Sequence, residues 1–253
     1  MVKTSWQGVE KWYDKTVGSD GHYYHQTVII PKTLQWLNLK KGDALLDLAC
    51  GQGVLERHIP RTVDYFGIDG AKSFIRSASN QAISDNHHFE VGDITKPYPI
   101  DKKDFSHFTC ILALQNVQDP ASALRLACEH LKKNGIGILV INHPVLRIPR
   151  QTSWHIDEQK KLQSRRIDRY LSPLEIPIQH HPGQVRQHAD SITTSFHFSL
   201  TDLFSWIEQA NMCVLSLEEW ISPKHSTGSK ARMENRARQE FPLFMALKLQ
   251  KKG

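Results

Sequence analysis

The sequence predicts an α/β fold in which a seven-stranded, mostly parallel sheet carries helices on both faces. From residue 43 onward, short apolar stretches alternate with amphipathic ones, which is typical of strands joined by covering helices. A glycine-rich turn follows the first apolar stretch, as in nucleotide-binding folds of this class. A length of 253 residues suits one such domain with an insertion.

The predicted strands are short apolar stretches bounded by turn residues, and they fall at residues 44–48, 65–68, 88–91, 105–112, 135–142, 212–217 and 244–249. Helices are expected between them at residues 54–59, 71–83 and 120–131. Asp119 and Pro120 mark the start of the last of these, and Asn134-Gly135 mark its end.

A further helix is predicted to begin at Ser199, because Ser199 and Asp202 have the spacing of a capping box. Phe198 is placed to pack on the first turn as a hydrophobic staple, and Asn211 suits the helix end. The expected buried stripe consists of Leu203, Phe204, Ile207 and Ala210.

The composition is that of a globular protein, with 40% hydrophobic and 23% charged residues. Residues 1–8 hold no apolar signal region, and the longest apolar run, residues 136–141, is too short to span a bilayer, so we expect a cytoplasmic protein. The four widely spaced cysteines predict reduced thiols and no metal site. A net charge of +6 permits an acidic small molecule or a nucleic acid as partner and requires neither.

The most informative stretch is residues 45–53, LLDLACGQG, an apolar strand that runs into an acidic residue and a glycine turn. Such a turn brings the backbone close to a cofactor. The third glycine of a dinucleotide fingerprint would fall at position 56, where Glu56 would repel a pyrophosphate. A nucleoside cofactor without phosphates therefore fits better, and a nicotinamide-dependent oxidoreductase is disfavoured.

Three motifs together resemble the class I S-adenosylmethionine-dependent methyltransferases, of the small-molecule type found in the ubiquinone/menaquinone-biosynthesis group. They are residues 45–53, residues 65–70 (YFGIDG) and residues 91–94 (VGDI), each at the end of a predicted strand. Ala49 stands where the family more often has its first glycine. The resemblance covers residues 41–142 well and residues 200–250 more loosely, and it implies a Rossmann-like sheet with S-adenosyl-L-methionine as cofactor.

The resemblance also implies roles for individual residues. Asp69 would accept hydrogen bonds from both ribose hydroxyls, Asp93 would accept the adenine amino group, and Ile94 would pack on the ring. Gly51 would admit the methionine part of the cofactor, with Asp47 holding the turn. The other expected cofactor contacts are Tyr24, His25, Ala49, Gly53, Gly70, Leu112 and Gln115. Turn or helix capping is the alternative role for Asp69 and Asp93.

Three regions are expected: an N-terminal helical lid (residues 1–40), the methyltransferase core (41–142 and 200–253) and a substrate cap (143–199). The insertion leaves from the carboxyl edge of the sheet, where open α/β sheets bind ligands. Six of the fourteen histidines lie in this insertion.

The expected reaction is in-line displacement at the sulfonium methyl by a small, acidic or aromatic acceptor. His143 follows the fifth strand and is the candidate general base, with fixing of the turn before Pro144 as the alternative. Arginine forks and aromatic walls suit the acceptor, and the candidates for binding it are Arg150, Trp154, Arg166, Tyr170 and His181. A solvated helix face is the alternative for the arginines.

Two other classes of function stay open. Nucleic-acid methylation is one, although the fourth strand lacks the Asn/Asp-Pro-Pro-Tyr/Phe sequence typical of amino-group methylation on bases. Residues 224–238 are basic and would either follow a phosphate backbone or form a solvated loop, which we favour. A non-catalytic sensor or scaffold that binds the cofactor is the other class. The sequence specifies neither the acceptor atom nor the oligomeric state.

Overall fold

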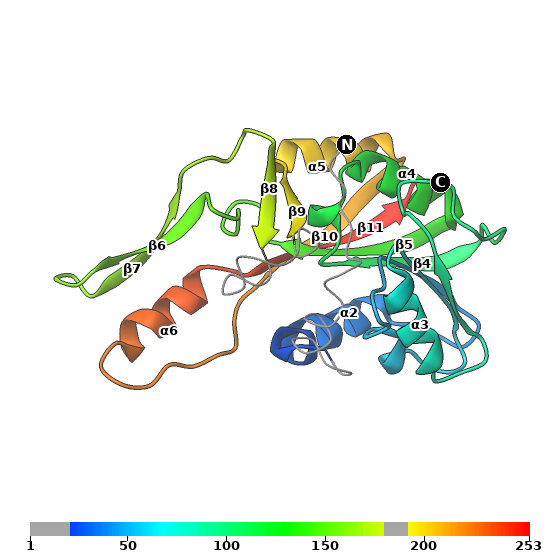
Figure 1. Ribbon diagram of the computed structural model, residues 1–253, viewed down its shortest axis with the longest axis horizontal. Coiled ribbons are helices and arrows are strands. Elements are labelled where there is room, and N and C mark those ends of the chain that lie inside the picture. The colour runs from blue at the N-terminus through cyan, green and yellow to red at the C-terminus, as the bar shows by residue number, and fades with distance from the viewer. Residues whose placement is uncertain (1–20, 180–191) are drawn as a thin grey trace.

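The computed structural model describes residues 21–179 and 192–253, and its centre is a seven-stranded sheet (Figure 1). The strand order is β10-β11-β5-β4-β1-β2-β3. The strands are β1 (Ala44–Leu48), β2 (Asp64–Asp69), β3 (His87–Val91), β4 (Phe105–Ile111), β5 (Leu131–Asn142), β10 (Met212–Trp220) and β11 (Phe244–Lys251). The pairings from β3 to β5 are parallel, whereas β11 runs antiparallel to both β5 and β10. The predicted fold class is confirmed.

Helices cover both faces of this sheet (Figure 1). On one face lie the π-helix η1 (His25–Ile29), α2 (Ile30–Leu37) and α3 (Lys72–Asn80), and on the other lie α4 (Pro120–His130) and α5 (Leu200–Gln209). In the described part of the chain, no helix combines the length and apolar character needed to cross a membrane.

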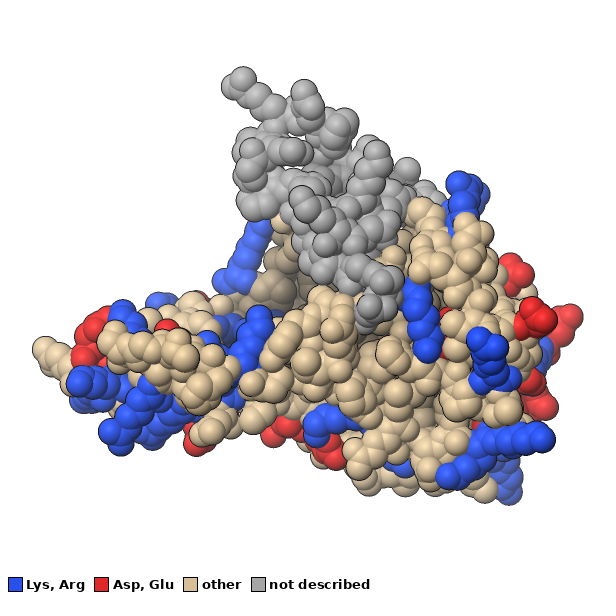
Figure 2. All heavy atoms as spheres, turned by 90° about the horizontal axis from the view of Figure 1, so that it is seen from below, with Lys and Arg blue, Asp and Glu red and all other residues tan. Residues whose placement is uncertain are grey.

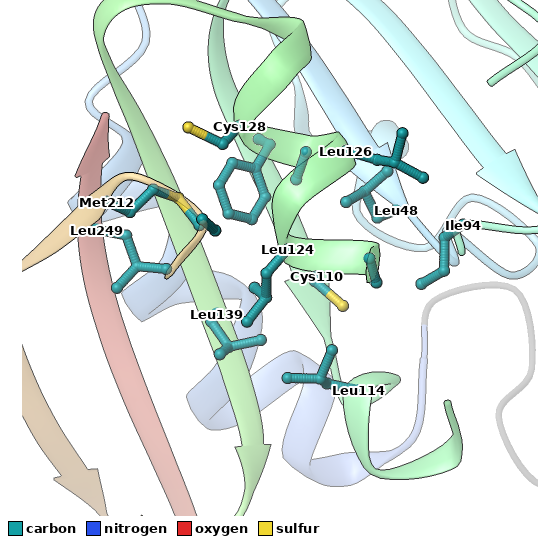
Figure 3. Close-up of a cluster of buried hydrophobic side chains, with 14 of the residues drawn as sticks. Leu48, Ile94, Cys110, Leu114, Leu124, Leu126, Cys128, Leu139, Met212 and Leu249 are labelled. Atoms are coloured by element: carbon teal, nitrogen blue, oxygen red, sulfur yellow. The ribbon is translucent and has the colours of Figure 1, made fainter. Parts of the chain in front are cut away.

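Two apolar clusters hold these layers together, and alternation along β1 divides its side chains between them. Leu46 belongs to the cluster under α4 and α5, whereas its neighbour Leu45 belongs to the cluster under α2. Figure 3 shows the first cluster, in which Leu124 of α4 lies close to Leu139 of β5. Both leucines are almost fully buried, which is worth about 1.5–3 kcal/mol for each side chain.

Of the four sequence signals that predicted the ends of α4 and α5, three are confirmed and one is wrong. Asp119 caps α4 by accepting from Ser122 N at 3.0 Å, and Ser199 and Asp202 form the predicted capping box of α5. Asn211 follows α5 with a left-handed φ of 58°. However, α4 ends at His130 rather than at Asn134-Gly135, because Leu131 is extended and pairs with Phe105 of β4.

The stripe expected on α5 needs one correction. Leu203 and Ile207 are buried, but Phe204 is 39% exposed. Trp206 packs against Phe198 instead, with ring centroids 5.1 Å apart.

The helix expected at residues 54–59 is also corrected. Only a short 3-10 helix, η2 (Glu56–His58), forms there, and Ile59 is already extended with ψ 133°. Pro60 disfavours a helical conformation at the residue before it, and six residues are too few to sustain an isolated α-helix.

The insertion forms two antiparallel hairpins rather than a single cap. The hairpin of β8 (Leu174–Gln179) and β9 (Ile192–His197) lies beside η3 (Leu114–Asn116), which follows β4. The hairpin of β6 (Thr152–Asp157) and β7 (Leu162–Ile167) projects away from the sheet (Figure 1). It runs beside α6 (Ala231–Glu240), so the solvated loop expected at residues 224–238 is in part a helix.

Candidate functional site

The glycine turn after β1 has the backbone that close approach of a ligand requires. Ala49, Gly51 and Gly53 have φ values of 54°, 57° and 79°, all in the left-handed region. Cys50, between them, donates its N–H to Ile68 O at 3.0 Å and so ties the turn to β2. Glycine adopts such φ values freely, whereas the Ala49 Cβ makes its conformation strained.

Asp69 lies at the carboxyl end of β2, directly beside this turn. Its Oδ2 accepts from Gly51 N at 3.0 Å and its Oδ1 accepts from Ala71 N at 2.8 Å. Burial raises the pKa of this carboxyl, and the two backbone N–H groups oppose that rise by stabilising the charged form. Each carboxylate oxygen keeps a free lone pair, so Asp69 can still accept two hydroxyl groups.

Asp47 does not hold the turn as expected, which is a correction. Its carboxylate is buried and accepts from Tyr65 Oη and Thr109 Oγ1, each at 2.7 Å. Asp47 therefore ties β1 to its neighbours β2 and β4 beneath the turn. Burial raises the pKa of Asp47 to about 6, although these hydrogen bonds oppose the rise.

Glu56 does not face the turn either. It is buried, accepts from Ile83 N at 2.9 Å and pairs with His87 Nδ1 at 2.6 Å. The expected repulsion of a pyrophosphate is therefore not the reason that a dinucleotide is disfavoured, because this carboxylate is buried and hydrogen-bonded to Ile83 N and His87.

The end of β3 carries the next predicted contacts. Asp93 Oδ1 accepts from both Thr95 N and Thr95 Oγ1, at 2.9 and 2.7 Å, so the carboxylate also stabilises its own turn. Ile94 is buried in the cluster under α4, and Gly70 is exposed next to Asp69. Asp69 and Asp93 thus lie at the ends of adjacent parallel strands, as an adenosine group requires.

A second left-handed residue, Leu112, ends β4 with φ 52°. Its N–H donates to Val140 O at 2.7 Å, and its carbonyl oxygen accepts from Gln115 Nε2 at 2.7 Å. The other amide atom, Gln115 Oε1, is buried and has no hydrogen-bond partner among residues 21–179 and 192–253.

A pocket opens beside these residues, past the ends of β4 and β5. Its polar lining consists of Gln115, Asn142, His143, Arg147, Ser195 and His197. Its apolar lining includes Ile141, Ile148, Phe196 and Phe198. We call it the acceptor pocket, after the role that we propose for it below. Because β4 pairs in parallel with both β1 and β5, the pocket and the glycine turn lie at the same edge of the sheet.

His143 lines the acceptor pocket, but both ring nitrogens are occupied. Nδ1 accepts from Val145 N and Leu146 N, each at 3.2 Å, so Nε2 carries the proton and donates to Glu219 at 2.7 Å. A general base needs a free ring nitrogen, so this geometry supports the alternative, in which His143 fixes the turn after β5.

Arg147 lines the pocket, whereas the sequence predicted the nearby Arg150 as an acceptor-binding residue. Its N–H donates to His143 O at 2.8 Å, and its guanidinium is half-buried. Burial lowers the pKa of Arg147, and the charge of Arg165 lowers it further. No local pattern marked this arginine, because its position depends on the turn that His143 holds.

The predicted acceptor residues are not gathered in the pocket. Arg166 is exposed on β7 and pairs with Asp168 at 2.6 Å. Trp154 lies on β6, between Phe241 and the guanidinium of Arg165. Arg150 is exposed with φ 59°, and Tyr170 Oη accepts from Leu200 N at the start of α5. His181 lies outside the described residues.

The N-terminal segment packs over the same edge of the sheet. Tyr24 Oη and Ser222 Oγ are 3.2 Å apart, and the Tyr24 ring lies 5.8 Å from that of Phe244. His25 is buried, stacks on His22, and has an Nδ1 without a partner in the described chain. Burial lowers the pKa of His25 to about 3, so its ring is neutral. Residues 1–20 of the predicted lid lie outside the described residues.

These features fit an adenosine-containing cofactor: a left-handed glycine turn, a carboxylate with free lone pairs after β2 and another after β3. Within residues 21–179 and 192–253, no group of three or more His, Cys, Asp or Glu residues could hold a metal ion. The fold and the site together define a Rossmann-like protein whose strand ends suit a nucleoside cofactor.

Comparison with known proteins identifies the family. The methyltransferase domain family matches residues 39–181, which is more than half of the chain. The chain therefore belongs to this family and carries a class I S-adenosylmethionine-dependent methyltransferase domain. An S-adenosylmethionine-dependent methyltransferase of Mesorhizobium loti has the same fold, with a TM-score of 0.68 and 20% identity over 92% of this chain and 100% of that one.

Two curated relatives match part of the sequence. A ubiquinone biosynthesis O-methyltransferase of Albidiferax ferrireducens is 30% identical over 132 residues, 49% of this chain and 50% of the relative. A 23S rRNA (uracil(1939)-C(5))-methyltransferase of Pasteurella multocida is 31% identical over 105 residues, 40% of this chain and 24% of that one. The chain thus spans half or less of the length of these relatives.

Proposed function

We propose that this protein transfers the methyl group of S-adenosylmethionine to a small, acidic or aromatic acceptor bound in the acceptor pocket. One observation carries the proposal: the pocket lies past the carboxyl ends of β4 and β5, and the glycine turn and Asp69 follow the carboxyl ends of β1 and β2 in the same parallel sheet. Ligands bind at this edge of open α/β sheets. Phe196 and Phe198 of the β8–β9 segment line the pocket and supply the apolar surface that an aromatic ring prefers.

In this proposal one set of residues binds the cofactor and another orients the acceptor. Asp69 would hold the ribose and Asp93 the adenine amino group, with Gly51 at the methionine part. The bound cofactor supplies an electrophilic methyl group for in-line displacement. The protein has to align the acceptor and exclude water, and alignment alone is worth about 7–11 kcal/mol in favourable cases.

The Albidiferax relative, whose name assigns O-methylation in ubiquinone biosynthesis, supports a small-molecule acceptor. It overlaps this chain over about half of each sequence. The acceptor side must therefore be tested directly.

RNA methylation is the second candidate, because the positive charge is concentrated in one part of the molecule. Residues 150–170 and 224–240 contain eleven lysines and arginines against five acidic residues, so they account for the whole net charge of +6. We call these two segments the basic arm. They form the β6–β7 hairpin and α6, where Figure 2 shows Lys and Arg side chains gathered. The RNA-modifying relative from Pasteurella adds support.

Two measurements test these functions. Calorimetry with S-adenosylhomocysteine asks whether the cofactor site binds, and absence of binding would refute both. Labelled S-adenosylmethionine is then incubated separately with small hydroxy acids, phenols and total RNA. Label in a small molecule supports the first function, and label in RNA that falls steeply with salt supports the second. Cofactor binding without any transfer would instead support a non-catalytic sensor or scaffold.

A further inference from the structure

Arg147 is a half-buried cation whose charge has no counterpart in the described chain. None of the ion pairs or side-chain hydrogen bonds among residues 21–179 and 192–253 involves its guanidinium. A charge removed from water without a partner is costly, so folds seldom keep one without a reason. The neighbouring Arg165 adds a second positive charge instead of compensating the first.

Arg165 cannot serve as the free cation itself. Its Nε donates to Leu146 O at 2.8 Å, its Nη2 donates to Thr152 Oγ1, and its guanidinium lies over the Trp154 ring. Arg165 is therefore fixed by the β6–β7 hairpin, and Arg147 is the arginine that lines the acceptor pocket.

The backbone that carries Arg147 is held firmly. His143 accepts two N–H groups of the turn at Nδ1, its carbonyl oxygen accepts Arg147 N, and Glu219 orients its ring. His143 is thus a positioning residue for Arg147. Because the backbone is held, only the side chain of Arg147 loses freedom when its guanidinium binds a carboxylate in two-point fashion.

Gln115 provides an unsatisfied acceptor on the wall of the same pocket. Its Nε2 is bound to Leu112 O, which sets the orientation of the amide, and leaves Oε1 buried without a donor. Buried polar atoms of this kind normally have a partner. An O–H or N–H group of a bound molecule would satisfy it.

We propose that the acceptor is a small carboxylic acid with a hydroxyl or amino group, held by Arg147 at its carboxylate and by Gln115 Oε1 at its O–H or N–H. This proposal rests on the proposed function and specifies its substrate class. Gln115 follows β4, which pairs with β1, and β1 leads into the glycine turn, whereas Arg147 follows β5, one strand further away. We therefore assign the O–H or N–H group as the methylated one and the carboxylate as the group that anchors the acceptor. The acceptor oxygen or nitrogen would form the new bond to the methyl carbon as the sulfur–methyl bond breaks, S-adenosylhomocysteine would leave with that electron pair, and the proton of the O–H or N–H group would pass to solvent water. Ile148 and Phe196 flank an apolar body between the two ends.

The experiment titrates the protein, saturated with S-adenosylhomocysteine, with the hydroxybenzoate isomers and with aliphatic hydroxy acids of three to six carbons. Each acid is compared with its neutral amide by calorimetry and NMR. We expect the acids to bind at least about tenfold more tightly than their amides, since charge-assisted hydrogen bonds exceed neutral ones by that margin. Arg147→Gln should remove this preference and leave amide binding unchanged.

A matched control is Arg61→Gln, an exposed arginine just before β2 at the opposite edge of the sheet, which should keep the preference. Gln115→Met should weaken the binding of hydroxy acids until it equals the binding of acids without the hydroxyl group. Asn116→Ala also removes a hydrogen bond to Leu112 O, but it should leave the binding of hydroxy acids unchanged. Unfolding of apo Arg147→Gln should show equal or greater stability than wild type, because an uncompensated charge has been removed.

Acids that bind no better than amides, acids that do not bind at all, or an unchanged preference in Arg147→Gln would each overturn the proposal. Failure of the proposed function looks different. In that case S-adenosylhomocysteine does not bind, and the same titrations on the apo protein still report on Arg147.

Discussion

The Asp69 carboxylate and the Gly51 N–H are 3.0 Å apart, so the end of β2 holds the glycine turn of β1 directly. One side chain therefore holds the turn and keeps a free lone pair on each carboxylate oxygen. We expect this double role to require a carboxylate at this position.

Asp69→Asn should weaken S-adenosylhomocysteine binding by about 1.5–3 kcal/mol, because an amide NH₂ cannot accept a hydroxyl. Calorimetry measures the loss. Asp101→Asn, an exposed substitution between β3 and β4, serves as control and should bind like wild type. Unchanged affinity in a folded Asp69→Asn protein would contradict ribose binding by Asp69.

Ala49→Gly should stabilise the protein by up to about 1 kcal/mol, since glycine adopts a φ of 54° without strain. Urea unfolding tests this. Ala121→Gly in α4 should have the opposite sign and cost about 0.5–1 kcal/mol, because helical φ values favour alanine. If both substitutions destabilise equally, the strain at Ala49 is negligible.

The free energy of unfolding should fall as the pH rises from about 4 to 6, because the buried Asp47 carboxyl loses its proton over this range. Burial raises its folded-state pKa to about 6 from an ordinary value of 3.8, so the native state binds the proton more tightly than the unfolded state. The stabilisation, of order 3 kcal/mol, is complete below the unfolded pKa and is lost through the folded pKa. Asp47→Asn should remove this component, whereas the exposed Asp104→Asn should retain it.

His143→Ala should destabilise the protein by about 1–3 kcal/mol, because Val145 N and Leu146 N lose their acceptor. Glu219→Gln keeps that acceptor and should cost clearly less. Urea unfolding of the two variants shows whether His143 stabilises the turn. A role confined to proton transfer would leave the stability of His143→Ala unchanged. A His143→Ala protein as stable as wild type would restore the general-base hypothesis.

Cofactor binding should slow hydrogen exchange at residues 21–29, where Tyr24 and His25 pack over the carboxyl edge of the sheet. Mass spectrometry with and without S-adenosylhomocysteine measures this. Helix α5 is the internal control, because it lies on the other face. Equal exchange in both states would argue against a lid over the cofactor.

Local signals in the sequence predicted much of the fold. The Ser199–Asp202 capping box and the Asp119 cap form as expected, because both depend on residues three positions apart. The end of α4 lies within one residue of the predicted bound, but Asn134-Gly135 does not end it, because Leu131 already leaves the helix to pair with Phe105. That pairing joins residues distant in sequence, which no local pattern records.

The sequence by itself determined the sheet, the glycine turn and the aspartates at the ends of β2 and β3, since strand periodicity and strand-end motifs are local. Only the tertiary structure decided which charged side chains reach the acceptor pocket. In the structure Arg166 is exposed and pairs with Asp168, and His143 is hydrogen-bonded to Glu219. Arg147 lines the pocket and has no acidic partner in the described chain. The physical reason is that the burial and pairing of a charge depend on what other strands and turns bring beside it.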